Sequence, residues 1–307
     1  MKRLLVALLI ALGSLGSPLA AQQVPTVRVI AGPTETSADA YYAYEMGFFR
    51  RAGLNVELQQ ARSGAVEAAA VASGSMDIGD SNLLSFADAK ARGLPFTAIA
   101  PGQNYDTSDP LAVLAVLPNS PYRSAKDLNG TTIGVISVGG IALLCVQGWI
   151  DRNGGDFGSL KMVEVTAAET VAALDQNRIA AGVLSDPQLS AERSRIRIIG
   201  KCYDAVAPKF MLTVWFSTTD WANKNPDPVR RFAEAMNAAE DWAERNPEQS
   251  RDVLEKWFKT KVVHMHHFHS RTIEPGMLQP VLDAAFKYKL VTKQLSAGDL
   301  IWTPGAK

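Results

Sequence analysis

The chain has 307 residues, of which 31 are basic, 31 are acidic and 47% are hydrophobic. This charge balance excludes the strongly basic surface typical of proteins that bind nucleic acid. The length is enough for two hydrophobic cores of about 100 to 150 residues each.

The first 21 residues have the order of a secretory signal. Lys2 and Arg3 precede an apolar run from Leu4 to Leu12, and small residues follow it. The run is shorter than the roughly 20 residues that span a bilayer, and no cysteine for a lipid anchor lies near the expected cleavage point. Removal of the signal leaves 29 basic against 31 acidic residues, a net charge of about −2. We therefore expect a periplasmic protein without a lipid anchor.

Strands and helices alternate after this segment, a pattern that favours two α/β lobes with parallel sheets. The first series ends near residue 102, and the same order of elements begins again at Thr131. At an offset of 103, Ser63 aligns with Thr166 and Gly79 with Gly182. The predicted strands are 24–32, 54–60, 76–80 and 94–102 in the first series and 131–137, 160–165 and 179–185 in the second. The predicted helices are 37–53, 64–74 and 82–93, followed by 141–155 and 168–178.

Two further apolar strands are predicted to connect the lobes. The chain would cross near residues 112–118 and return near 212–217, which gives a two-strand hinge. Lobe one then comprises residues 22–113 plus 216–307, and lobe two comprises 114–215. The chain after residue 219 is predicted to be helical, its first long helix has a single apolar stripe, and we expect these helices to pack on lobe one.

In open α/β sheets, ligands bind in the loops beyond the carboxyl ends of the strands. Here these loops are rich in Ser, Thr, Asn and Gly, which offer hydroxyl, amide and backbone N–H groups to an anionic head group. For any one of these residues, a role as a helix cap is about as well supported as a role in ligand binding. The candidate ligand-binding residues are Thr34, Thr36, Ser37, Ser63, Gly64, Ser81, Asn82, Ser137, Gly139, Gly140 and Asp186.

Aromatic residues near these loops could form a wall for an organic ligand. Tyr41 and Trp215 are the main candidates, together with Tyr42, Tyr105 and Phe216. Aromatic side chains at such positions are more often part of the core. Asp186, the one acid in a loop of this class, could bind a cationic group or cap the following helix.

Five segments of the chain resemble the substrate-binding proteins of nitrate-, taurine- and sulfonate-type ABC importers and the related binders of thiamine-pyrimidine precursors. The segments are "YYAYEMGFFRRAGLNVEL", "ASGSMDIGDSN", "DLNGTTIGV", "ALDQNRIAAGVLSDP" and "NPDPVRRFAEAMNAAEDWAERNPE". The resemblance implies a type II periplasmic binding fold, with two α/β lobes, two hinge strands and a cleft that closes around one small molecule. It points to the same Ser, Thr, Asn and Gly positions, with "SVGG" where relatives commonly have a Gly-Ser pair.

The resemblance also implies a function. A monomer would capture a small organic molecule, anionic or heterocyclic, and deliver it to an inner-membrane ABC permease with its ATPase, without a cofactor. Arg62 is the one arginine clearly placed in a ligand loop. Sulfonate or nitrate binders are expected to need a stronger cationic or multi-donor pocket, which leaves neutral heterocycles and aromatic carboxylates open.

An enzyme is one alternative, because thiamine-pyrimidine synthases share this fold. Those enzymes depend on a cysteine-rich motif and on an active-site histidine in the cleft. Here Cys145 lies within a predicted helix and the histidines all come late in the sequence. The two cysteines, Cys145 and Cys202, could form a disulfide or remain buried thiols. We expect no catalytic residue.

A metal-binding protein is the other alternative, because all four histidines lie in "KVVHMHHFHSR". Imidazole groups bind zinc, copper and nickel. On a helix, His264 would pair with His267 and His266 with His269, whereas on a strand His264 and His266 would share one face. Neither geometry unites all four, so we expect a connector behind lobe one, away from the ligand cleft.

Overall fold

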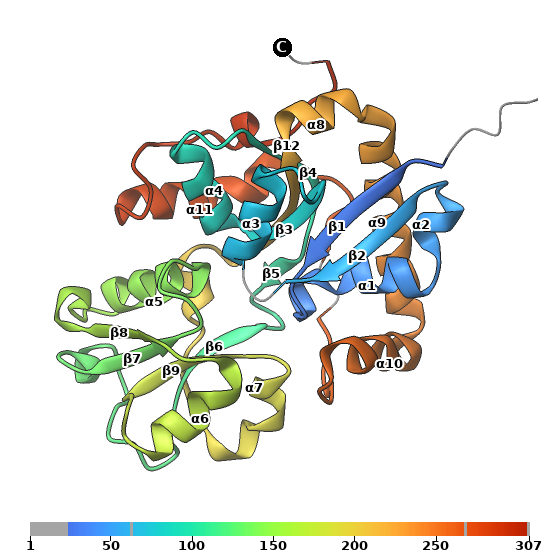
Figure 1. The fold of residues 1–307 in the computed structure, drawn as a ribbon. Coiled ribbons are helices and arrows are strands. Elements are labelled where there is room, and N and C mark those ends of the chain that lie inside the picture. Colours follow the sequence, from blue (N-terminus) through green and yellow to red (C-terminus); the bar gives the residue numbers. More distant parts are fainter. Residues whose placement is uncertain (1–23, 62–63, 267–268, 306–307) are drawn as a thin grey trace, which may run out of the picture.

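The computed structural model describes residues 24–61, 64–266 and 269–305; the predicted signal segment lies outside them. Figure 1 shows two lobes, each built around a five-stranded sheet. The first sheet has the strand order β2-β1-β3-β12-β4, formed by Asn55–Gln60, Thr26–Ala31, Ile78–Asn82, Thr213–Thr218 and Phe96–Pro101. The second has the order β8-β7-β9-β6-β10, formed by Lys161–Glu164, Thr132–Val135, Ala181–Ser185, Ala112–Val116 and Arg197–Gly200.

The two sheets share one topology. Strand β1 runs parallel to β2 and β3, as β7 runs parallel to β8 and β9, while β12 and β6 are antiparallel to their neighbours. Helix α3 (Gly64–Ala72) and strand β3 correspond to α6 (Ala167–Asp175) and β9, and each boundary differs by the predicted 103 residues. The internal repeat is therefore confirmed.

Glycine occupies equivalent places in the repeat because the helix packs closely on the strand there. A Cβ atom on Gly79 would lie 3.1 Å from both Val71 and the Phe216 ring. On Gly182 it would lie 2.6 Å from the Thr170 methyl group. A larger residue at either position would push the helix off its sheet.

The alternation of strands and helices is confirmed, with one break. The helix predicted for residues 37–53 is interrupted at Gly47, whose φ of 75° is incompatible with a continuous helix. The result is two helices, α1 (Ala38–Glu45) and α2 (Phe48–Arg51). Gly53 ends the second helix with a φ of 71°, at the predicted position.

The hinge lies elsewhere than predicted. The strands expected to cross between lobes, β6 and β12, each belong to one of the large sheets. The connection instead contains two short antiparallel strands, β5 (Asn104–Asp106) and β11 (Lys209–Met211). The prediction was wrong because a continuous apolar run such as "AVLAV" is most stable between two neighbours in a covered sheet, and all five residues of β6 are buried.

The late helices pack mainly on lobe one, as predicted. Helix α9 (Pro226–Arg245) lies against α1, α2 and β4, and α10 (Pro247–Phe258) lies against α1. Between β12 and α9 lies the short α8 (Thr219–Lys224). Helix α11 (Pro275–Lys287) packs on α4 (Leu83–Ala91) and β11, and also contacts α5 (Ile141–Arg152) of lobe two. Lobe one therefore carries most of the chain after residue 212 (Figure 1).

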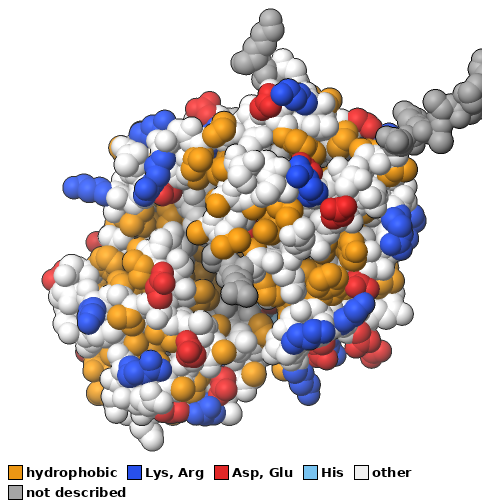
Figure 2. All heavy atoms as spheres, viewed as in Figure 1, with side chains coloured by type: hydrophobic (Ala, Val, Ile, Leu, Met, Phe, Trp, Pro, Cys, Tyr) orange, Lys and Arg blue, Asp and Glu red, His pale blue; other side chains and the backbone are white. Residues whose placement is uncertain are grey.

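Cys145 and Cys202 are free thiols, and both are fully buried. Burial raises the pKa of Cys202 to about 12 and that of Cys145 well above its ordinary value, so neither is a reactive thiolate at neutral pH. Among the described residues, no helix is long and apolar enough to cross a membrane. On the face drawn in Figure 2, basic and acidic side chains are interspersed and form no extended basic surface.

Candidate functional site

The loop after β1 is held in place by a buried carboxylate. Asp80, on the neighbouring strand β3, accepts hydrogen bonds from the Ser37 hydroxyl at 2.8 Å and from the Gly32 N–H at 3.3 Å. Ser37 is fully buried, so its hydroxyl positions the loop. Thr34 is exposed and Thr36 is half-buried, with their hydroxyl oxygens 3.1 Å apart. These two threonines are the polar groups that this loop offers to a ligand.

Glu67 on α3 lies against Asp80, and burial raises the pKa of both carboxyl groups. Burial, followed by the charge of Asp80, raises the pKa of Glu67 to about 10. The raised pKa favours the protonated form of Glu67 at neutral pH, while Asp80 accepts the hydrogen bond from Ser37. The ligand loop thus rests on two buried, adjacent carboxyl groups.

Loops from the two lobes meet beside this pair. Asn82 caps α4 by accepting a hydrogen bond from the Ser85 N–H at 3.0 Å. The Ser85 hydroxyl then donates to the Gly139 carbonyl oxygen of lobe two at 3.4 Å. Gly139 is exposed, whereas Ser81 and Gly140 are buried. The predicted loops "DSN" and "SVGG" therefore face each other across the cleft.

The remaining loop candidates are spread more widely. Gly64 is exposed at the start of α3, and Ser63 and Arg62 lie outside the described residues. Ser137 is half-buried, and its carbonyl oxygen accepts a hydrogen bond from the Gly140 N–H at 3.1 Å. This bond closes the turn that begins α5.

The predicted aromatic wall is wrong for this conformation. Tyr41 and Trp215 are fully buried. The Tyr41 hydroxyl donates to the Gly32 carbonyl oxygen at 2.9 Å, and the Trp215 Nε1–H donates to Asp39 at 2.9 Å. The reason is that lobe-one helices cover these rings and remove them from the cleft. The other three aromatic candidates are each at most 2% exposed, namely Tyr42, Tyr105 and Phe216.

The histidine segment lies at the cleft, which corrects the prediction that it lies behind lobe one. The segment lies alongside the start of strand β5, where Gln103 and His269 form a β-bridge. The Gln103 side-chain amide donates a hydrogen bond to the His266 carbonyl oxygen at 3.2 Å, and the Asn104 amide donates to the Ser270 hydroxyl at 2.8 Å. The prediction failed because the position of this segment depends on pairing with a strand that is far away in the sequence. His267 lies outside the described residues.

His266 is surrounded by acids from three parts of the chain. Its Nδ1 atom lies 3.2 Å from Glu35 in lobe one. Its Nε2 atom lies 3.6 Å from Asp109, which follows β5, and 3.7 Å from Asp186, which follows β9 in lobe two. Desolvation opposes protonation, but the hydrogen bond that the Glu35 carboxylate accepts from the ring and the three negative charges raise the pKa of His266 above its ordinary value.

Asp186 has two roles in this arrangement. One carboxylate oxygen accepts a hydrogen bond from the Ser190 N–H at 2.9 Å, which caps the short helix α7 (Gln188–Ala191). The other oxygen faces His266. One oxygen of this acid therefore binds an N–H in the first turn of the helix, and the other remains directed at His266.

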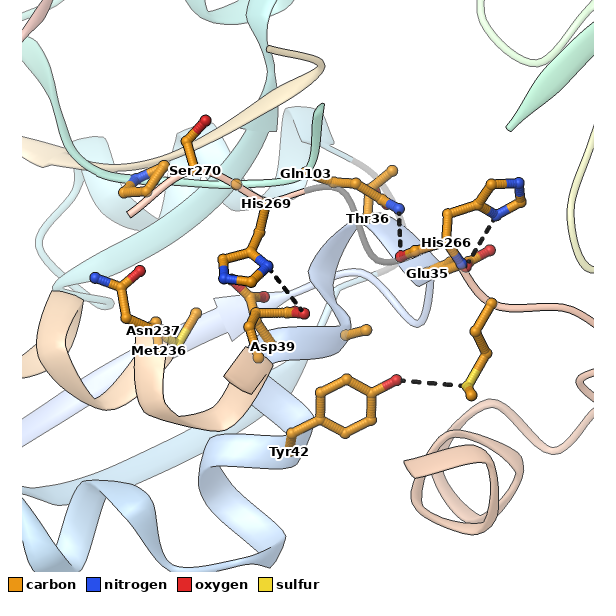
Figure 3. Close-up of a pocket in the computed structure, with 15 residues that line it drawn as sticks. Glu35, Thr36, Asp39, Tyr42, Gln103, Met236, Asn237, His266, His269 and Ser270 are labelled. Atoms are coloured by element: carbon orange, nitrogen blue, oxygen red, sulfur yellow. Dashed lines mark hydrogen bonds and ion pairs between the residues drawn. The ribbon is translucent and has the colours of Figure 1, made fainter. Parts of the chain in front are cut away.

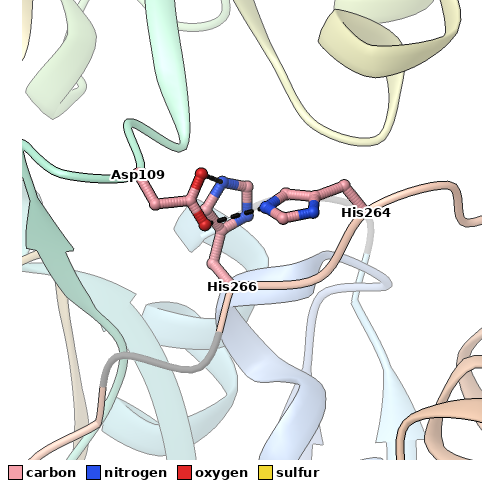
Figure 4. Close-up of side chains that lie close together, drawn as sticks. All are labelled: Asp109, His264 and His266. Atoms are coloured by element: carbon pink, nitrogen blue, oxygen red, sulfur yellow. Dashed lines mark hydrogen bonds and ion pairs between the residues drawn. The ribbon is translucent and has the colours of Figure 1, made fainter.

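Among the residues that the structure describes, Asp109, His264 and His266 form a group of possible metal ligands (Figure 4). The His264 Nε2 atom lies 2.8 Å from Asp109 Oδ2, and the two imidazole rings are 4.6 Å apart and nearly perpendicular. One donor atom from each of the three residues lies within 4.8 Å of the others. The strand-like pairing of His264 with His266 is therefore the one observed. The acid Asp109, between β5 and β6, is the sequence signal that points to this group.

A small polar cavity lies next to this group, inside lobe one (Figure 3). Its volume of about 20 Å³ holds about one water molecule and excludes an organic ligand. Burial raises the pKa of Asp39 to about 8 and that of Glu240 well above its ordinary value, and it lowers the pKa of His269. The cavity is therefore lined by buried ionisable groups, and the Nδ1 atom of His269 has no hydrogen-bond partner there.

The sequence matches the family model described as "NMT1/THI5 like" over residues 35–250. Comparison with curated proteins gives no significant match. Among solved structures, the fold is similar to the periplasmic aliphatic sulphonate-binding protein SsuA of Escherichia coli, with a TM-score of 0.73 and 18% identity over 92% of this chain and 93% of that one.

Two other solved structures are similar to the same extent. The alkanesulfonate-binding protein SsuA of Xanthomonas axonopodis, bound to MOPS, has a TM-score of 0.73 and 16% identity over 90% of this chain and 98% of that one. The periplasmic nitrate-binding protein NrtA of Synechocystis PCC 6803 has a TM-score of 0.72 and 14% identity over 90% and 85%. The expected two-lobed periplasmic binding fold is confirmed, and the chain belongs to the NMT1/THI5-like family.

Proposed function

We propose that the protein captures one small organic molecule between its lobes and delivers it to an inner-membrane ABC permease, without catalysing a reaction. The observation that carries this proposal is the contact between Ser85 and Gly139, which brings a ligand loop of each lobe to the same cleft. The similar solved structures are named as sulfonate- and nitrate-binding proteins, which supports a solute-binding function. The signal-like first 21 residues support a periplasmic location.

The chemistry of the cleft favours a neutral heterocycle or an aromatic carboxylate. The described parts of the ligand loops contain no arginine and offer hydroxyl and backbone N–H groups, notably at Thr34, Thr36 and Gly139. A sulfonate or nitrate ion needs several strong donors or a cation to replace its hydration. The acids Asp109 and Asp186 at the same cleft also disfavour a free anion.

Closure would involve the short strands that join the lobes. Strands β1 to β4 and β12 form the sheet of one lobe and β6 to β10 that of the other, with β5 and β11 in a separate small sheet. Two short paired strands can absorb a change in angle with little loss of packing. The solute would then be enclosed by loops of both lobes.

A thermal-shift screen of pyrimidines, other heterocycles, aromatic carboxylates and sulfonates tests this function. A ligand that binds the folded protein stabilises it by RT ln(1 + [L]/Kd), about 2.7 kcal/mol at 100 times Kd, and raises the melting temperature. Thr34→Val should weaken binding of a hit, whereas Thr292→Val, at an exposed position distant in sequence from the ligand loops, should not.

Two results would contradict the proposal. One is the absence of any stabilising compound in a broad panel when native mass spectrometry shows ligand-free protein. The other is turnover of a bound compound by the purified protein, detected as a product by mass spectrometry, because this would indicate an enzyme.

A further inference from the structure

We propose that Asp109, His264 and His266 bind one divalent first-row cation of the zinc class, with Asp186 as the fourth ligand. The site goes beyond solute capture and does not depend on it. It joins three parts of the molecule: the late connector of lobe one, the segment after hinge strand β5 and the loop after β9 in lobe two.

The spacing of the donor atoms fits a tetrahedral site. With bonds of about 2.0 to 2.1 Å to zinc, two ligand atoms at tetrahedral angles are about 3.3 to 3.4 Å apart. The observed distances are 2.8 Å from Asp109 Oδ2 to His264 Nε2, 3.6 Å from Asp109 Oδ1 to His266 Nε2 and 3.7 Å from Asp186 Oδ2 to His266 Nε2. Asp109 faces each histidine with a different oxygen, and one donor atom of each of Asp109, His264 and His266 lies within 4.8 Å of the others, so the ligands would draw closer together around a bound ion.

His266 is already oriented as metal ligands usually are. Its Nδ1 atom faces the Glu35 carboxylate, which also accepts a hydrogen bond from the His266 backbone N–H. A carboxylate on one ring nitrogen fixes the tautomer and presents the lone pair of the other nitrogen to a metal. Glu35 is itself buried, which holds the imidazole in this orientation.

The free nitrogen of His266 has no hydrogen-bond partner. Its Nε2 atom is buried and unpaired, while 1% of the side chain is exposed. An unpaired buried nitrogen costs free energy unless a ligand, a water molecule or a proton satisfies it. His264 and Asp109 are 46% and 39% exposed, which leaves an entry path for an ion.

Charge and ligand type indicate which ion would bind. Two carboxylates and two neutral imidazoles balance a doubly charged cation. Imidazole and carboxylate suit zinc, nickel and cobalt, whereas copper(I) prefers thiolates. Both cysteines are buried elsewhere, in α5 and in the turn at residues 202–205.

A bound ion would stabilise the closed arrangement of the lobes. Asp186 moves with lobe two, and the histidines move with lobe one. A cation held by both would restrict opening, since separating the lobes would break a metal bond. Binding of the ion and closure of the cleft are therefore expected to be coupled.

Isothermal titration of untagged, chelator-treated protein with zinc chloride tests the site. We expect one ion per chain with submicromolar affinity. Glu35→Gln, which removes the orienting carboxylate, should weaken binding about 10- to 100-fold. His264→Ala and Asp109→Asn should weaken it at least as much. His269→Gln is the matched control, because this ring lies against Glu240 and Glu244 and outside the group.

Circular dichroism of each variant would show that it is folded. Wild-type zinc binding only in the millimolar range would overturn the proposal and leave a protonated His266 among three carboxylates as the explanation. An equal loss of affinity in His269→Gln and His264→Ala would also overturn it, as it would indicate diffuse binding along the histidine segment.

Small-angle X-ray scattering tests the fourth ligand. Zinc should reduce the radius of gyration of the wild type, and Asp186→Asn should abolish this compaction. Compaction that persists in this variant would refute the role of Asp186. Because these titrations contain no organic solute, their failure would leave solute capture standing, and a failed solute screen would leave the metal site standing.

Discussion

The Nε2 atom of His266 lies 3.7 Å from the carboxylate of Asp186, so a residue of the late connector in lobe one faces a residue of lobe two. Both side chains are almost completely buried. A contact between groups that belong to different lobes depends on the angle at the hinge. This pair therefore reports directly on whether the cleft is open or closed.

The hydrogen bond from Ser37 to Asp80 should stabilise the ligand loop. Ser37→Ala removes a donor to a buried carboxylate and should lower the free energy of unfolding by about 1 to 3 kcal/mol. Urea denaturation measures the difference. Ser73→Ala is the control, because this hydroxyl is exposed and its loss should change stability by less than about 0.5 kcal/mol. Equal effects in the two variants would rule out a specific role for Ser37.

Stability should fall as the pH rises, because Glu67 is protonated in the folded protein. Its pKa is raised from an ordinary 4.5 to about 10, so between these values the folded state binds a proton that the unfolded state has lost. The stabilisation is fully present below pH 4.5 and is lost as the pH rises through 10. Asp39, with a pKa raised to about 8, adds to the same trend at lower pH.

Glu67→Gln tests this dependence, since glutamine stays neutral at every pH. The free energy of unfolding, measured in urea at about pH 5, 7 and 9, should decrease less steeply in the variant than in the wild type. Glu57→Gln, at an exposed position of the edge strand β2, should keep the wild-type slope. A wild-type stability that increases from pH 5 to 9 would contradict the assignment.

Gly182 should not tolerate alanine. The new Cβ atom would lie 2.6 Å from the Thr170 methyl group and 3.1 Å from Ile179, so α6 would have to move away from β9. We expect a loss of about 1 to 3 kcal/mol in the free energy of unfolding, measured with denaturant. Gly276→Ala, in the first turn of α11 with no atom within 4 Å, should be neutral or slightly stabilising. Full stability of Gly182→Ala would show that the helix can shift freely.

The sequence by itself determined the elements and their repetition. These elements followed from local signals, namely hydrophobic periodicity, Gly53 at a helix end, and Asn246 with Pro247 at a helix start. The structure has the helix end and the helix start at these residues. The offset of 103 was visible because equivalent glycines face the same close packing in both lobes. The polar loops followed from the order of strands and helices, since that order fixes which strand ends meet.

Only the tertiary structure decided which of these loops and side chains share the cleft. Tyr41 and Trp215 are hidden because helices far along the chain cover them, and no local pattern shows this. The histidine connector reaches the hinge because Gln103 pairs with His269. Asp109 and Asp186 approach His266 only through the angle between two lobes. Such contacts join residues distant in sequence, and their free energy depends on packing that forms only when the whole chain folds.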